Sequence, residues 1–194
     1  MLNGKKIRAQ EHTIAYELRR SARKTLSLEI REDGSLLVRA PKSCEKSRIE
    51  AFIRETEDWI REKSEAQKRR ERKAEEGPKL TDAQRQLYRE RSREVFEQKT
   101  AYYARIMGVS YERIAIRDQK TRWGSCSAKK NLNFNWRLIL APAGVLDYVV
   151  VHELAHLREM NHSARFWAVV EETMPDYRKY RSWLRENGRI LQNM

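Results

Sequence analysis

Three of the four histidines of this 194-residue chain lie within eleven residues, and this cluster constrains the fold more than any other feature. His152 and His156 are separated by four positions, and Glu153 directly follows the first of them. On a helix, residues i and i+4 lie about 40° apart around the axis, so both rings point to the same side. Glu153 is rotated by about 100° from His152, so its carboxylate can flank an ion without ligating it. The pattern predicts a metal site on one face of a helix.

The third histidine, His162, predicts a bend in the chain. It follows His152 by ten residues, which on an unbroken helix would turn it away from the shared face. We therefore expect a helix over residues 142–160, a left-handed turn at Asn161 and a new helix capped by Ser163. Apolar residues at helical spacing support the first helix independently: Val145, Leu146, Val149, Val150, Leu154 and Leu157.

The chemistry of three imidazoles favours zinc. Neutral imidazole is well matched to Zn²⁺, and three protein ligands leave the fourth position of a tetrahedral ion for water. The pKa of such a water falls toward about 7, and Glu153 is placed to take its proton before attack on a polarised carbonyl. One zinc ion is the expected cofactor, although Ni²⁺ and Co²⁺ accept the same ligands in a purified sample. A cluster of core histidines without metal is the alternative.

These residues resemble the YgjP-like metallopeptidase domain, a bacterial zincin family with an HExxH motif that is related to the SprT and WLM proteases. The resemblance rests on residues 152–156, on Asn161-His162-Ser163 with Phe166-Trp167, and on residues 120–127 and 132–142. It takes in nearly the whole chain and is most specific over residues 120–167.

The resemblance implies that His152, His156 and His162 are metal ligands and that Glu153 is the general base in peptide-bond hydrolysis. It also implies an α+β fold with a zincin-like metallopeptidase core, a small, mostly antiparallel sheet and an inserted long helical hairpin. Glu159 stands where metzincins have glycine, so the sequence departs from that group and their Met-turn is not carried over.

The pattern along the chain divides it into three segments, which we expect to form one integrated domain. Residues 1–41 predict an N-terminal β-meander, residues 42–110 a charged segment of two helices, and residues 111–194 the zincin-like catalytic core. The expected strands cover residues 13–18, 25–30, 36–39, 113–117, 122–126 and 132–138. The expected helices besides the metal helix cover residues 47–77, 82–107 (stopped by Gly108), 163–174 and 175–188.

Several polar and aromatic residues are candidates for contact with substrate. The expected strand 132–138 precedes the metal helix, as the substrate-aligning edge strand does in zincins, and an extended peptide can add to such an edge. Asn133, Asn135 and Trp136 are therefore candidates, while an interior strand with Trp136 in the core is the alternative. Zincins also need a donor for the oxyanion, and the sequence does not choose among the candidates Tyr177, Tyr180 and Arg181.

The chain is strongly basic, with 41 Lys and Arg against 28 Asp and Glu and a net charge of +13. A positive surface attracts nucleic acid by long-range steering, and it is also a common solubility device. Basic clusters at residues 19–24 and 68–73 predict non-specific phosphate contacts, although glutamates interleave the second, as they do on an exposed helix. The competing hypothesis is a nucleic-acid-associated, SprT-like metal protein, in which the metal is structural or the protease is recruited to DNA.

Location and partners follow from composition. No stretch approaches the roughly 18 apolar residues of a membrane span. Cys44 and Cys126 are too few for a disulfide framework, which fits a reducing compartment. We therefore expect a cytoplasmic protein that acts on a peptide or protein and contacts no membrane. The sequence predicts neither the oligomeric state nor whether the helical middle covers the cleft.

Overall fold

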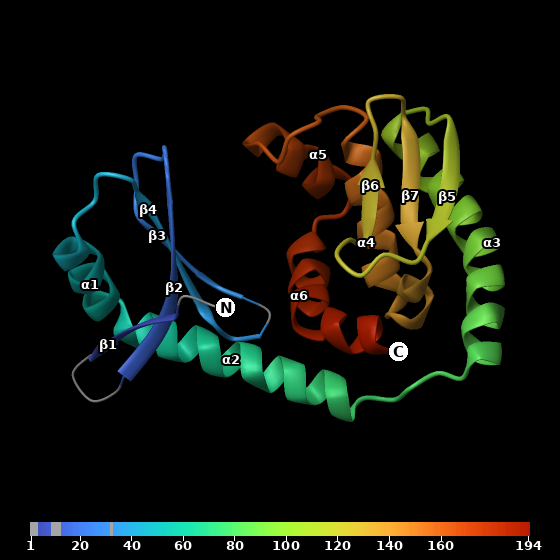
Figure 1. Cartoon of the computed structure of the whole chain (residues 1–194). Helices are drawn as coiled ribbons and strands as arrows, with labels where there is room; N and C mark the ends of the chain where they lie inside the picture. Colours follow the sequence, from blue (N-terminus) through green and yellow to red (C-terminus); the bar gives the residue numbers. More distant parts are fainter. Residues whose placement is uncertain (1–3, 9–12, 32) are drawn as a thin grey trace. The chain divides into compact units, whose positions relative to one another are not determined.

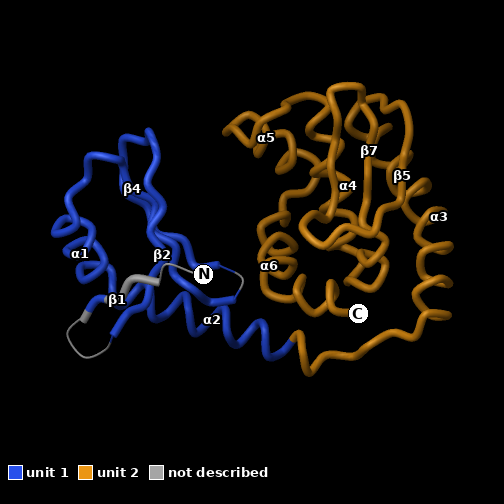
Figure 2. Tube along the Cα trace, in the orientation of Figure 1, with its two compact units in different colours: residues 1–73 blue, residues 74–194 orange. Residues whose placement is uncertain are grey.

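The computed structural model describes residues 4–8, 13–31 and 33–194, and the chain forms two compact units (Figure 2). Unit 1 is Met1–Lys73 and unit 2 is Ala74–Met194. The boundary falls inside the segment 42–110 that the sequence pattern groups together. Each unit contains a sheet, and its helices pack on its own core.

The sheet of unit 1 differs from the expected meander. Its order is β1-β2-β4-β3, and β2 pairs with β4 in parallel, with Tyr16 opposite Leu36. Burial explains the order, because Leu36, Leu37, Val38 and Ala40 are all buried, which favours a central place for their strand. The strands are β1 (Gly4–Arg8), β2 (Thr13–Ser21), β3 (Ser27–Ile30) and β4 (Leu36–Pro41).

The expected helix 47–77 is two helices, α1 (Lys46–Glu55) and α2 (Glu57–Glu76) (Figure 1). They separate at Thr56, whose hydroxyl donates to the carbonyl of Phe52 at 2.7 Å. Ile49 and Ile53 of α1 are fully buried and join the core of unit 1. The end of α2 passes the boundary after Lys73, so the first expected helix belongs mainly to unit 1.

Helix α3 (Asp82–Met107) has the expected bounds and lies wholly in unit 2. Thr81 caps it in a reciprocal box with Gln84, and Gly108 stops it in the left-handed conformation at φ 63°. The expected long hairpin of α2 and α3 is therefore not one structural element, because the two helices belong to different units. Five buried positions face the core at helical spacing: Ser92, Phe96, Thr100, Ala104 and Met107.

The sheet of unit 2 has the order β5-β7-β6, so β7 lies in the interior and β6 at an edge. The expected strand 132–138 ends at Asn135, because the Asn135 side chain accepts from the amide of Arg137 and begins a 3-10 helix. Over both sheets, three of the five described pairings are antiparallel. The elements are β5 (Arg113–Arg117), β6 (Gly124–Cys126), β7 (Asn131–Asn135) and the 3-10 helix η1 (Trp136–Leu140).

Three further helices complete unit 2: α4 (Ala143–Ala155), α5 (Ala164–Thr173) and α6 (Tyr177–Asn193). Helix α4 is central, because α3, α5, α6 and β6 all contact it. Helix α6 does not stop at Gly188 as expected. It continues to Asn193, and Gly188 lies inside it, where a Cβ would come within 3.0 Å of the Trp123 ring.

Among the described residues, no helix combines the length and apolar character needed to cross a bilayer.

Candidate metal centre

The fold brings the three clustered histidines of unit 2 together. Their ring centroids are 4.8 to 5.1 Å apart, and the Nε2 atoms of His152 and His162 are separated by 3.0 Å. One ligand atom from each of His152, His156 and His162 lies within 4.8 Å of the others. Nitrogen ligands at zinc–nitrogen distances of 2.0–2.1 Å in a tetrahedron stand roughly 3.3 Å apart. The cluster therefore fits a single divalent ion.

The bend that joins the histidines lies earlier than expected. Helix α4 ends at Ala155, not near residue 160, and His156 is its C-terminal cap. Asn161 does not adopt a left-handed conformation; its side-chain oxygen accepts from the amide of Ser163 at 3.2 Å. Ser163 caps α5 as expected, accepting from the amide of Phe166. A tight turn after α4 thus replaces one more turn of helix.

Main-chain and aromatic contacts orient the rings. The Nδ1 atom of His156 lies 3.1 Å from the carbonyl oxygen of Glu159, so a proton on Nδ1 leaves Nε2 free as a ligand atom. Phe166 is fully buried, and its ring centroid lies 4.5 to 4.9 Å from all three histidine rings. The Phe166 ring therefore packs against all three imidazoles and helps to hold them in place.

The surroundings favour the neutral form of His152 and His156. Burial, and then the neighbouring histidines, lowers the pKa of His152 to about 3. Burial also lowers the pKa of His156 below its ordinary value. Neutral imidazole is the form that ligates a metal, so His152 and His156 need no proton loss at neutral pH.

Glu153 is a buried carboxylate beside the cluster. It is 5% exposed, and burial raises its pKa to about 8. Gly124 of β6 makes room for it, since a Cβ at this position would lie 2.6 Å from the Glu153 Oε1 and Cγ atoms. Cys126 is on the same strand, and burial followed by the charge of Glu153 raises the pKa of its thiol to about 11. The thiol is therefore protonated at neutral pH, and Cys126 is not among the residues whose ligand atoms converge.

A stack of aromatic rings and one cation borders the cluster. Trp167 lies 5.8 Å from the rings of His152 and His162 and stacks on Tyr177 at 5.3 Å. The exposed guanidinium of Arg181 sits 4.5 Å over the Trp167 ring, and its charge contributes to the lowered pKa of His152. Tyr177 itself is 4% exposed.

Tyr180 faces the other end of α4. A Cβ at Gly144 would lie 2.4 Å from the Tyr180 ring. Gly144 precedes His152 by eight residues, which is about 12 Å of helix. Of the three sequence candidates for oxyanion donor, the structure therefore brings Tyr177 and Arg181 toward the cluster and leaves Tyr180 apart.

The three candidates from the expected edge strand serve the fold. Asn133 lies on the interior strand β7 and bonds to Ser125 Oγ at 3.1 Å and Arg117 Nε at 3.0 Å. Asn135 is 1% exposed, and its amide nitrogen donates to the carbonyls of Gln119 and Arg122. Trp136 is fully buried. Asn135 and Trp136 are therefore too deeply buried to contact a substrate. The hydrogen bonds of Asn135 stabilise the loop before β6.

Of two further residues near the site, Gly124 and Arg181, only Gly124 has a local sequence pattern that indicates its role. Glycine inside a strand pattern signals a close approach, which could have identified Gly124. No local pattern indicates the stacking of Arg181 on Trp167, because the two residues lie on different helices.

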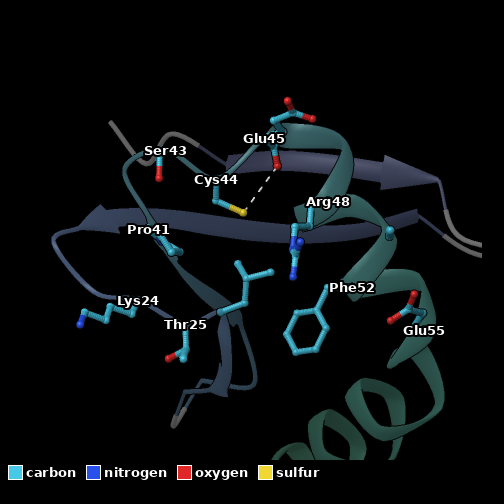
Figure 3. Close-up of a pocket in the computed structure, with 11 residues that line it drawn as sticks. Lys24, Thr25, Pro41, Ser43, Cys44, Glu45, Arg48, Phe52 and Glu55 are labelled. Carbon is cyan, nitrogen blue, oxygen red and sulfur yellow. Dashed lines mark hydrogen bonds between the residues drawn. The ribbon is translucent and has the colours of Figure 1, made fainter.

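A cavity of about 850 Å³ lies in unit 1, between the β2–β3 connection, the end of β4 and α1 (Figure 3). Its charged lining is balanced, with Lys24 and Arg48 against Glu45 and Glu55, and no histidine lines it. This cavity is thus distinct from the histidine cluster, and the chemistry of the side chains identifies the candidate site.

His152 and Glu153 lie on α4, His156 caps that helix, and His162 lies in the loop before α5. Three converging histidines with a buried glutamate next to the first of them in the sequence are typical of metal-dependent hydrolases. The model of the YgjP-like metallopeptidase domain matches residues 24–84 and 67–187, so the chain belongs to this family. It is accordingly a metallopeptidase, and the family implies a divalent metal and a peptide or protein substrate. A search of curated proteins finds no match.

Two solved structures of metallopeptidase zymogens are similar to part of the chain. Abylysin of Pyrococcus abyssi is 23% identical with a TM-score of 0.43, over 46% of this chain and 90% of that one. Jannalysin of Methanocaldococcus jannaschii is 19% identical with a TM-score of 0.41, over 46% of this chain and 92% of that one.

Proposed function

We propose that the protein is a zinc-dependent peptidase that hydrolyses peptide bonds with Glu153 as its general base. The observation that carries the proposal is the convergence of three imidazoles, with a buried glutamate at the position of α4 that directly follows the first of them. Zinc, when bound by His152, His156 and His162, supplies a Lewis acid that acidifies water and polarises the substrate carbonyl.

Glu153 moves the proton. Burial raises the pKa of Glu153 to about 8, so without a metal the side chain is mostly protonated at pH 7. A cation bound by the neighbouring histidines would favour the carboxylate form, which is the form that accepts a proton. We infer that it accepts a proton from the attacking water and passes it to the nitrogen of the leaving amine. Gly124 keeps the space that the Glu153 side chain needs for this transfer.

The substrate is oriented by β6 rather than by the strand expected from the sequence. Strand β7 is interior, with β5 and β6 as its neighbours, whereas β6 pairs only with β7 among the described strands. It carries Gly124 and contacts α4, the helix of His152 and Glu153. An extended peptide that adds to β6 through its main chain would therefore pass beside Glu153.

Arg181 is the group we assign to the carbonyl oxygen. It is a cation without a carboxylate partner among the described residues, and stacking on Trp167 holds it beside the cluster. Fixed positive charge at the place where an oxyanion develops stabilises the transition state. Tyr177 packs behind Trp167 and supports this arrangement.

The decisive experiment compares the parent with Glu153→Gln on a library of short peptides. We expect both proteins to bind one equivalent of metal, and the variant to cleave at least about 100-fold more slowly, the scale of a lost acid–base group. Elemental analysis distinguishes zinc from nickel and cobalt. Equal cleavage rates would refute the role of Glu153. Arg181→Gln should slow turnover with metal content unchanged.

A second candidate is recruitment of the protease by nucleic acid. Exposed cations at both ends of the sheet of unit 2 support it. Arg113, Lys129 and Lys130 lie where β5 and β7 begin, and Arg117, Lys120 and Arg122 lie at or just after the end of β5. Of the acids next to these cations, Asp118 pairs with Arg137, whereas Glu112 is exposed beside Arg113. By contrast, Arg19 of the first predicted basic cluster pairs with Glu17, and Arg20 donates to three main-chain carbonyls.

The recruitment hypothesis predicts salt-sensitive binding. Affinity for duplex and single-stranded DNA should fall steeply as salt rises, and Lys129→Glu with Lys130→Glu should flatten that slope. No binding at low salt would exclude the hypothesis. We also propose a reducing, cytoplasmic location, which the free thiols of Cys44 and Cys126 support.

A further inference from the structure

Unit 1 contains a groove of about 430 Å³ that no catalytic residue lines. One wall is formed by Leu28, Glu29 and Ile30 of β3, and the other by residues of α2 that include Trp59, Lys63 and Arg70. The volume lies in the range of ligand-binding sites. Both walls belong to unit 1, so the groove is complete within it.

The β3 wall is the edge of a sheet. Neighbouring residues of a strand point to opposite faces, so a groove that touches Leu28, Glu29 and Ile30 in succession runs along the strand's edge. The sheet order places β3 at the end, with β4 as its only partner among the described strands. Main-chain amides and carbonyls on its outer side are therefore available to another extended chain.

The α2 wall is one stripe of a helix. Its lining positions advance by three or four from Trp59 to Arg70, which spans about 16 Å of helix. Trp59 is 41% exposed, a large apolar surface at one end of the stripe. The wall is long enough to lie beside a strand of four or five residues, at about 3.3 Å per residue.

One cation in the lining of the groove has no ion-pair partner among the described residues. Glu29 pairs with Arg39 at 2.8 Å, and Lys63 pairs with Glu62 at 2.9 Å. Arg70 is half-buried at the far end from Trp59 and has no ion-pair partner among the described residues. The uncompensated charge of the groove is positive, which complements a carboxylate.

We propose that this groove binds an extended, acidic polypeptide segment by strand addition to β3. The segment's main chain bonds to the edge of β3, an apolar side chain covers Trp59, and a carboxylate reaches Arg70. An α-helical partner has no main-chain groups to spare for a strand edge, so the free edge specifies an extended segment. The groove thus gives the metallopeptidase a second contact for unfolded chain, at residues apart from those of the metal site.

The test measures binding by the full chain with the Glu153→Gln substitution, which lets peptides bind without being cleaved. The probes are fluorescent octapeptides of alternating valine and threonine that end in aspartate, beside the same peptides ending in asparagine amide. We expect the acidic form to bind at least 10-fold more tightly. N-methylation of alternate peptide nitrogens should abolish the binding, because it removes donors to β3.

Matched variants assign the contact to the groove. Arg70→Glu should weaken binding of the acidic peptide at least 10-fold, while Arg69→Glu makes the same charge change one position away, outside the lining, and should leave it unchanged. Trp59→Ala should weaken both peptides equally. Equal effects of the Arg69 and Arg70 substitutions, or binding that survives N-methylation, would overturn the proposal. So would sedimentation that shows a second copy occupying the groove. Parent cleavage rates are independent of these outcomes.

Discussion

The two units of the chain organise their hydrophobic residues in different ways. In unit 1 the buried core is aliphatic apart from Tyr16, and it lies between a mixed sheet and α1. Unit 2 buries Phe96, Phe134 and Phe166, and the last of these supports the histidine cluster. The described cavity and groove lie in unit 1, whereas the titratable groups with strongly altered pKa values lie in unit 2. The two cavities and the histidine cluster thus lie on separate cores.

The largest effect that would sharpen this contrast comes from Phe166→Ala. Removal of a fully buried aromatic ring costs about 3–5 kcal/mol of unfolding free energy. All three histidine rings lose their common contact, so metal affinity should fall as well. Chemical denaturation and metal titration measure the two losses. Unchanged metal affinity would show that the turn alone places the imidazoles.

Ile53→Ala is the corresponding test in unit 1. This fully buried residue of α1 should cost about 2–5 kcal/mol, and hydrogen exchange should locate the loss in residues 13–60. Metal affinity and cleavage rates should stay at the parental values, because the catalytic groups lie on the other core. A fall in metal affinity in this variant would contradict the proposal that the metal site depends on the core of unit 2 alone.

Gly124→Ala tests the close approach within unit 2. The added Cβ would meet the Glu153 side chain at 2.6 Å and displace its carboxylate. A displacement of about 1 Å at a reacting group lowers turnover by up to about 100-fold, and metal content should stay at one equivalent. Steady-state kinetics with elemental analysis measure both quantities. Ser125→Ala, the next position, is the control and should leave turnover near the parental rate.

The smallest effect is a chemical difference at Cys126. Its thiol pKa is raised to about 11, so only a minute fraction is thiolate at pH 8, and alkylation should accelerate only as the pH approaches 11. Glu153→Gln removes a negative charge that raises this pKa, so the variant should be alkylated faster at pH 8. Iodoacetamide labelling with mass spectrometry measures the rate at each cysteine. Identical alkylation rates at Cys126 in the parent and the variant would show that the charge of Glu153 does not raise the pKa of the Cys126 thiol.

Local signals predicted the elements better than their arrangement. The cap at Ser163, the stop at Gly108 and the bounds of α3 follow from residues within one turn, and the structure has them. The order of the first sheet does not follow, because the central place of β4 depends on what packs on both of its faces. Likewise, Asn135 begins η1 through its side chain, which ends a strand pattern that alternates through Leu138.

The same distinction holds at the site. The spacing of the histidines indicates the cluster directly, since it depends on helix geometry and one bend. The places of Tyr177, Tyr180 and Arg181 depend on how α6 lies against α4 and α5, which spacing does not encode. The early end of α4 also depends on tertiary packing, because Leu157 continues the apolar pattern beyond it.

The contact between His156 and the carbonyl of Glu159 has a consequence for variation at this position. The acceptor is a main-chain oxygen, so replacement of the Glu159 side chain leaves the tautomer of His156 as it is. Tolerance of many side chains at 159 would then coexist with strict dependence on the shape of the turn. Natural selection would therefore conserve the backbone conformation at position 159, while the amino acid at that position varies freely.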